Sequence, residues 1–136
     1  MKAITQKHPE GCALACAAML AGRSYDEIAS LAAPLGIRAG DKTLYTSTDP
    51  LQCLLDQLGI PVTSTERPFV GWDSLPDRAL LAIKWHVEET LAMWHWVVFH
   101  RDESGEAILD PAPDRDDPVR RDLSGIHSKW YIEVLK

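Results

Sequence analysis

The sequence contains no apolar run long enough to cross a bilayer, because charged or turn-forming residues interrupt every hydrophobic segment. Its first residues, Met1 to Gln6, also lack the apolar stretch of a signal peptide. Cysteine occurs only three times, and an odd count excludes a framework in which every cysteine is paired. These absences predict a soluble protein made in a reducing cytoplasm. Delivery to another compartment or cell by a signal-less route would leave no trace in the sequence.

Basic clusters are missing as well. The chain has 14 Lys and Arg against 20 Asp and Glu, and its formal net charge is −6. Its densest basic spot, Arg120 and Arg121, lies among Asp116, Asp117 and Asp122. A general nucleic-acid binder would show a basic face, so this class is excluded. With 136 residues, 46% of them hydrophobic, and no internal repeat, the chain suits a single domain over residues 1–136.

Helix signals fill the first half of the chain. An alanine-rich run follows Gly11 and stops at Gly22, which predicts a helix from Cys12 to Ala21. A capping-box pattern of Ser24 and Glu27 predicts a second helix. A third is predicted by Asp49 as the cap, Pro50 in the first turn and Gln52 three residues after the cap. The expected apolar faces are Tyr25, Ile28, Leu31 and Ala32 in the second helix, and Leu51, Leu54, Leu55 and Leu58 in the third.

Strand signals fill the second half. Residues 91–100 are almost continuously apolar or aromatic, which predicts a strand buried on both faces. Residues 103–105 predict a hairpin turn into a strand at 107–109. Further strands are expected at 61–65, 79–85 and 130–135, with a short helical turn at 72–77 and a surface loop at 110–117. Helices followed by an antiparallel sheet predict an α+β domain.

Cys12 stands at the first turn of the alanine-rich helix. A helix N-terminus offers partial positive charge and free N–H groups, which stabilise a thiolate, and the thiolate is the nucleophilic form of cysteine. Gly11 has no side chain, so a substrate can approach closely there. A cysteine at a helix start can equally be inert.

Three further residues complete a candidate constellation. His95 starts the run 95–99 within a buried strand that would hold an imidazole rigidly, as a general base requires. If residues 103–105 form a hairpin, Asp110 returns beside His95 and can orient its ring. The Gln6 amide and the Cys12 N–H can donate to an oxyanion. Each residue also has an ordinary explanation: a core histidine, a turn aspartate or a surface glutamine. Their joint order favours a thiol-dependent active site.

Three segments of the sequence resemble the bacteriocin-processing peptidases that cleave double-glycine leaders, a family of papain-like cysteine peptidases. They are residues 6–22, 95–99 and 108–111. The resemblance implies a papain-like fold with N-terminal helices packed on a C-terminal antiparallel sheet. It also implies that Gln6 lines the oxyanion hole, Cys12 attacks, His95 is the base and Asp110 orients it. The family usually has an acidic residue directly before the cysteine, where this chain has Gly11.

Several neighbouring residues are weaker candidates. His8 and Trp96 flank the proposed centre and could line a substrate cleft, although exposure of His8 and core packing of Trp96 explain them equally well. Cys16 lies one helical turn after Cys12, and we expect it to be a small buried core residue rather than a resolving thiol or a zinc ligand. Cys53, inside the third helix, is expected to pack in the core.

The sequence therefore predicts a cysteine peptidase or amide hydrolase that cuts a peptide or protein substrate through a thioester. The predicted mechanism needs no metal or organic cofactor. One alternative is an acyl transferase of the transglutaminase kind, in which an amine replaces water; the sequence does not separate the two. Another is a non-catalytic binding module on a peptidase fold, against which the complete set of four residues argues.

Overall fold

The computed structural model describes residues 1–38, 40–41 and 44–135. Within them the chain forms three α-helices and then a sheet of six strands, the α+β architecture expected from the sequence. The helices are α1 (Cys12–Ala21), α2 (Tyr25–Ala32) and α3 (Asp49–Gln57), with short 3-10 helices η1 (Ala33–Leu35) and η3 (Trp72–Ser74). The strands are β1 (Arg67–Pro68), β2 (Arg78–Glu88), β3 (Leu91–Asp102), β4 (Gly105–Leu109), β5 (Val119–Arg120) and β6 (Ser128–Glu133).

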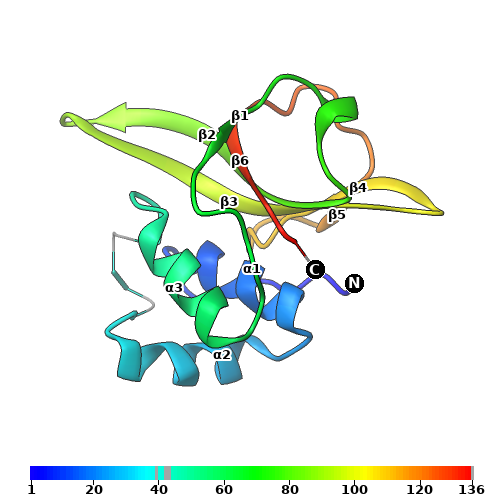
Figure 1. Ribbon diagram of the computed structural model, residues 1–136. Coiled ribbons are helices and arrows are strands. Elements are labelled where there is room, and N and C mark those ends of the chain that lie inside the picture. Colours follow the sequence, from blue (N-terminus) through cyan, green and yellow to red (C-terminus); the bar gives the residue numbers. More distant parts are fainter. Residues whose placement is uncertain (39, 42–43, 136) are drawn as a thin grey trace.

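The sheet has the order β1-β6-β2-β3-β4-β5, and every neighbouring pair is antiparallel. In Figure 1 the helices gather on one side of the sheet, and the β2–β3 hairpin projects beyond the other strands. Strand β4 pairs with β3 only from Val98 to Asp102, so the earlier part of β3 has no β4 partner. This leaves an edge of β3 facing the helices and the loops, and the candidate site lies there.

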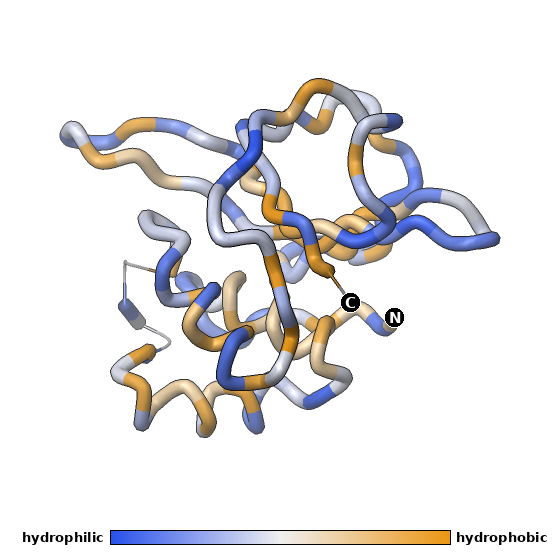
Figure 2. The backbone as a smooth tube through the Cα atoms, in the orientation of Figure 1, coloured by the Kyte–Doolittle hydropathy of each residue, from blue (hydrophilic) through white to orange (hydrophobic). Residues whose placement is uncertain are grey.

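The predicted strand is found as β3, but it is buried on both faces only over residues 96–99, and Leu91 at its start is 44% exposed. Trp96 and Val98 belong to the core cluster shared with the helices, whereas Val97 and Phe99 pack on the opposite face with η3 and the loops. Alternation of side chains along a strand produces this division. Figure 2 shows the contrast between these apolar central strands and the hydrophilic turn that joins β3 to β4.

Helix α1 is the most deeply buried helix, with every residue from Cys12 to Met19 buried. Its small alanine side chains allow close approach, and it contacts α2, α3 and β3. Gly22 ends it in the left-handed conformation with φ 67°, as the sequence predicts. Because α1 is surrounded by other elements, its first residue is held firmly against the sheet.

Three sequence expectations for the helical half are wrong. Leu31 is 44% exposed, because the 100° step per residue puts it beside Ile28 on the side away from Tyr25 and Ala32. Thr48, not Asp49, precedes α3, and the Gln52 amide donates to the carbonyls of Thr63 and Ser64 instead of capping the helix. Cys53 is exposed on α3, so it does not pack in the core.

Two expectations for the sheet also differ from the structure. Residues 61–65 form only a single bridge, Val62 with Val134, because the Thr63 hydroxyl takes the Glu133 N–H that a strand carbonyl would accept. The short strand at 67–68 takes this place in the sheet. The sequence gives no signal for strand β5, which positions Arg120.

Candidate active site

Cys12 is the first residue of α1 and is 3% exposed. Among the residues that the structure describes, no side chain caps this helix end, and the first turn of α1 holds no acidic residue. The first N–H groups of a helix have no acceptor within the helix, and they concentrate partial positive charge. Cys12 therefore lies at a helix N-terminus, the position that the sequence predicts for it.

His95 lies on β3, three residues before the stretch that pairs with β4. On the other side its partner is Ile83 of β2, next to a bulge where Lys84 and Trp85 interrupt the regular register. The imidazole is 16% exposed. Pairing with β2 on one side fixes the backbone of His95. The unpaired edge on the other side lets the ring face neighbours from other elements.

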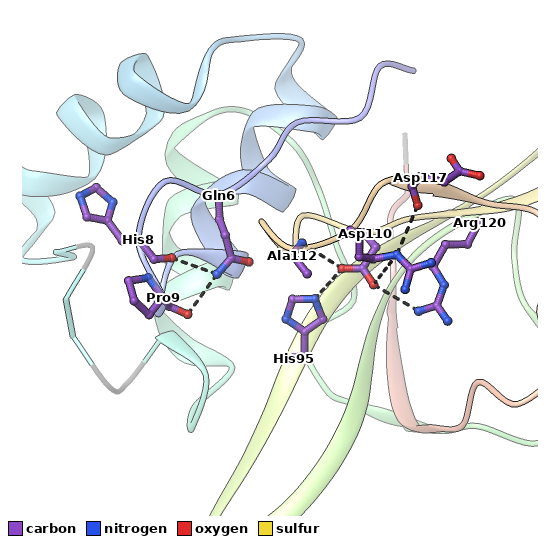
Figure 3. A network of polar contacts seen from close by, with 9 residues as sticks. Gln6, His8, Pro9, His95, Asp110, Ala112, Asp117 and Arg120 are labelled. Atoms are coloured by element: carbon purple, nitrogen blue, oxygen red, sulfur yellow. Dashed lines mark hydrogen bonds and ion pairs between the residues drawn. The ribbon is translucent and has the colours of Figure 1, made fainter.

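Asp110 follows β4 directly and is fully buried. Its Oδ1 accepts a hydrogen bond from His95 Nε2 at 2.7 Å and another from the Ala112 N–H at 3.0 Å. Its own N–H donates to the Pro118 carbonyl at 2.8 Å. Figure 3 shows the Asp110 carboxylate pointing at the His95 ring from the end of its strand. The structure thus brings together two residues that are separated by a hairpin, in the arrangement that the sequence predicts.

The bond to Asp110 uses Nε2 of His95, which leaves Nδ1 for a second partner. Burial, the largest single influence, would lower the pKa of His95, and the Asp110 hydrogen bond opposes it. A hydrogen-bond interaction with Cys12 and the charges of both partners act in the same direction, and the pKa of His95 rises to about 9. Cys12, His95 and Asp110 therefore form one interacting group, and its contacts favour the protonated imidazole.

Asp110 has two further partners that the sequence analysis missed. Its Oδ2 accepts a hydrogen bond from Arg120 Nη1 at 3.2 Å and lies 3.9 Å from Arg115 Nε. Burial would raise the pKa of Asp110, but the His95 bond and charge, the Ala112 N–H and Arg120 together lower it to about 2. In the sequence, Arg120 stands among acidic residues that suggest a solvated loop, and only the pairing of β5 with β4 turns it inward.

Gln6 is 5% exposed, so it is not a surface glutamine. Its Nε2 donates to the carbonyls of His8, at 2.9 Å, and Pro9, at 3.0 Å, as Figure 3 shows. Its buried Oε1 has no hydrogen-bond partner among the described residues. The side chain therefore braces the loop that leads to Cys12, and donation to an oxyanion requires Nε2 to release one of the two carbonyls.

The other predicted site residues have structural partners. A Cβ at Gly11 would overlap the Tyr25 hydroxyl, so the glycine makes room for this tyrosine. His8 is exposed, and its Nδ1 is hydrogen-bonded to the same hydroxyl at 2.9 Å. Trp96 is fully buried in the helix-facing core, so no face of it is open to a substrate. Packing around Tyr25 and β3 explains these three positions.

Cys16 is also fully buried, as expected. Burial, reinforced by the charges of Cys12 and Asp110, raises its pKa well above the ordinary value. It is therefore a neutral thiol. Within residues 1–38, 40–41 and 44–135, no group of three or more His, Cys, Asp or Glu side chains is arranged to hold a metal ion.

The helices of the described part of the chain are all too short or too polar to span a membrane. Comparison with known proteins gives no family: no protein-family model matches this chain, and no curated protein matches it in sequence.

Proposed function

We propose that this protein is a papain-like cysteine peptidase or amide hydrolase, with Cys12 as nucleophile, His95 as acid and base, and Asp110 as the residue that orients His95. One observation carries the proposal. A fully buried carboxylate binds His95 Nε2 at 2.7 Å, and the same imidazole interacts with a cysteine at a helix N-terminus. This is the relation of nucleophile, base and orienting group that covalent acyl transfer requires.

The proposed reaction begins from an imidazolium at His95 beside a thiolate at Cys12. The raised pKa of His95 supports the protonated ring at neutral pH. The thiolate attacks the carbonyl carbon of the scissile amide, and the Cys12 N–H and the Gln6 amide stabilise the oxyanion. His95 then donates its proton to the leaving amine as the C–N bond breaks, which leaves a thioester on Cys12. His95 next takes a proton from water, the hydroxide attacks the thioester, and the acid product leaves.

The order of elements supports a papain-like arrangement for the proposal. Cys12 begins a central helix in the helical layer, while His95 and Asp110 come from adjacent strands of an antiparallel sheet. The reacting groups thus meet where the two layers join. A peptide or protein is the proposed substrate, because a thioester mechanism cleaves amides without a cofactor.

The first test is alkylation of the cysteines by iodoacetamide between pH 5 and 9, measured peptide by peptide with mass spectrometry. Cys53 is a useful internal reference because it is exposed, whereas Cys12 is 3% exposed. If access alone governed the rates, Cys53 would react faster. We expect Cys12 to react faster than Cys53 at pH 6, and His95→Ala to remove this advantage. Labelling of Cys12 no faster than that of Cys53 would refute a catalytic thiol.

A second test identifies the reaction. The protein is incubated with a mixed peptide library, with and without an added primary amine, and products are analysed by mass spectrometry. Cleavage that is lost in Cys12→Ala supports hydrolysis, whereas products that retain the added amine would indicate acyl transfer. Cys53→Ala is the matched control, since it removes an exposed thiol away from the site.

A further inference from the structure

The carboxylate of Asp110 has no access to solvent, and both of its oxygens are occupied. Oδ1 accepts hydrogen bonds from His95 and the Ala112 N–H, whereas Oδ2 accepts one from Arg120 Nη1 at 3.2 Å. A carboxylate without water around it is stable as an anion only with a cation or several donors beside it. Arg120 is the permanent cation of this arrangement, because a guanidinium stays charged at every relevant pH.

Resting on the proposed function, we propose that Arg120 is a positioning residue for the reaction: it holds the Asp110 carboxylate charged and turned so that Oδ1 faces His95. Figure 3 shows Arg120 on the side of Asp110 opposite the imidazole. Its bond to Oδ2 prevents the carboxylate from rotating away. It therefore acts on Cys12 through Asp110 and His95.

Charge balance in the buried group supports this role. Around Asp110 the structure places these charged or titratable side chains: His95 of β3, Arg120 of β5, Arg115 of the loop between β4 and β5, and the thiols of Cys12 and Cys16. In the reactive state, a Cys12 thiolate and the Asp110 carboxylate oppose a His95 imidazolium and the Arg120 guanidinium. Without Arg120, only the more distant Arg115 would offset the second negative charge, which favours protonation of Asp110 or Cys12.

Arg115 is the weaker of the two arginines. Its Nε lies 3.9 Å from Oδ2, beyond a hydrogen bond, and donates to the Asp117 carbonyl at 3.2 Å. Its side chain is 34% exposed, against 20% for Arg120. Water screens an exposed charge, so Arg115 contributes less to Asp110. The effect of removing Arg120 should therefore exceed that of removing Arg115.

The test measures the rate of Cys12 alkylation by iodoacetamide from pH 5 to 9 in Arg120→Met, Arg120→Gln and Arg120→Lys. Loss of a cation from this buried group disfavours its anionic members, the Cys12 thiolate among them, and each pKa unit changes the population of a charged form about tenfold. We expect alkylation at pH 6 to slow about tenfold in the Met and Gln variants, and the rise of rate with pH to move to higher pH. Arg120→Lys restores a cation and should recover part of the rate. Arg121→Met, next in sequence and exposed, should match the wild type.

A double-mutant cycle separates positioning from general loss of structure. Because Arg120 acts through Asp110, Arg120→Gln should slow Cys12 little further in an Asp110→Asn background. If Arg120→Gln slows Cys12 alkylation equally in the wild-type and Asp110→Asn backgrounds, the inference is overturned. It is also overturned if Arg120→Met or Arg120→Gln is folded and keeps the wild-type pH profile of alkylation while His95→Ala reacts slowly. Circular dichroism identifies the folded variants. If wild-type Cys12 reacts no faster than Cys53, the proposed function fails, and this inference fails with it.

Discussion

The replacement Asp110→Asn gives the sharpest prediction about the buried network. The pKa of Asp110 falls from an ordinary value of 3.8 to about 2, with burial opposing the shift and the His95, Ala112 and Arg120 contacts producing it. At 1.36 kcal/mol per pKa unit, the carboxylate contributes about 2.5 kcal/mol to the free energy of unfolding at neutral pH. A carboxyl group whose pKa is lower in the folded state than in the unfolded state stabilises the fold fully at pH values above the unfolded-state pKa. This stabilisation is lost as the pH falls through the folded-state pKa. The affected range is therefore pH 4 down to 2.

The assay is urea denaturation followed by far-UV circular dichroism at pH 5, 4, 3 and 2, in wild type and Asp110→Asn. At pH 5 the variant should be less stable by about 3–5 kcal/mol, because it leaves the buried charges of His95 and Arg120 unpaired. At pH 2 the difference should shrink by about 2 kcal/mol, because the Asp110 carboxyl is then protonated in half of the wild-type molecules. Protonation of other carboxylates affects both proteins equally and cancels in the difference.

Asp114→Asn is the matched control for this experiment, since Asp114 is exposed in the loop that follows Asp110. Its stability difference from the wild type should be near zero and the same at every pH. The reasoning is refuted if the difference between wild type and Asp110→Asn stays constant from pH 5 to pH 2. Such a result would mean that Asp110 is not held as an anion by its partners.

Three further predictions concern the site and its approach. The Gly11→Ala variant should be destabilised by about 1–3 kcal/mol in urea denaturation, because its Cβ would overlap the Tyr25 hydroxyl, and Tyr25→Phe in that background should recover part of the loss. Gln6→Ala should lower kcat on a cleaved peptide by about 100-fold or more, through loss of an oxyanion donor and of the loop contacts to His8 and Pro9. Turnover should fall as pH rises through about 9, where the raised pKa of His95 predicts loss of the proton needed by the leaving amine.

Each of these three has a clear contrary result. Gly11→Ala with wild-type stability would show that the loop moves away from Tyr25 without cost. For Gln6, an unchanged kcat would remove it from the oxyanion hole, and Lys7→Ala, which alters an exposed neighbour, is the control. A pH–rate profile that declines near pH 6.5 instead of 9 would mean that Asp110 and Cys12 do not stabilise the imidazolium. Asp110→Asn should move the decline to lower pH, because the neutral amide no longer stabilises the His95 imidazolium.

Local patterns predict those parts of the fold that short-range chemistry controls. The alanine-rich run and Gly22 fix α1, and Ser24 accepts the Glu27 N–H as the capping box requires. The nearly continuous apolar run of β3 and the turn before β4 are also found as predicted. Local sequence is less informative where a side chain binds a group outside its own element. The Thr63 hydroxyl accepts the Glu133 N–H, and the expected strand does not form; the Gln52 amide donates to Thr63, and the expected helix cap does not form.

The sequence by itself determined the order of the candidate triad: Cys12 at a helix start, His95 on a strand and Asp110 after a hairpin. It did so because each of these placements follows from a neighbouring helix, strand or turn signal. Only the tertiary structure decided that the Asp110 carboxylate is fully buried, that it meets His95 at 2.7 Å and that Arg120 holds its other oxygen. Those contacts join β3, β4 and β5 across the sheet, and no local pattern encodes which side chain of a two-residue strand will face a buried charge.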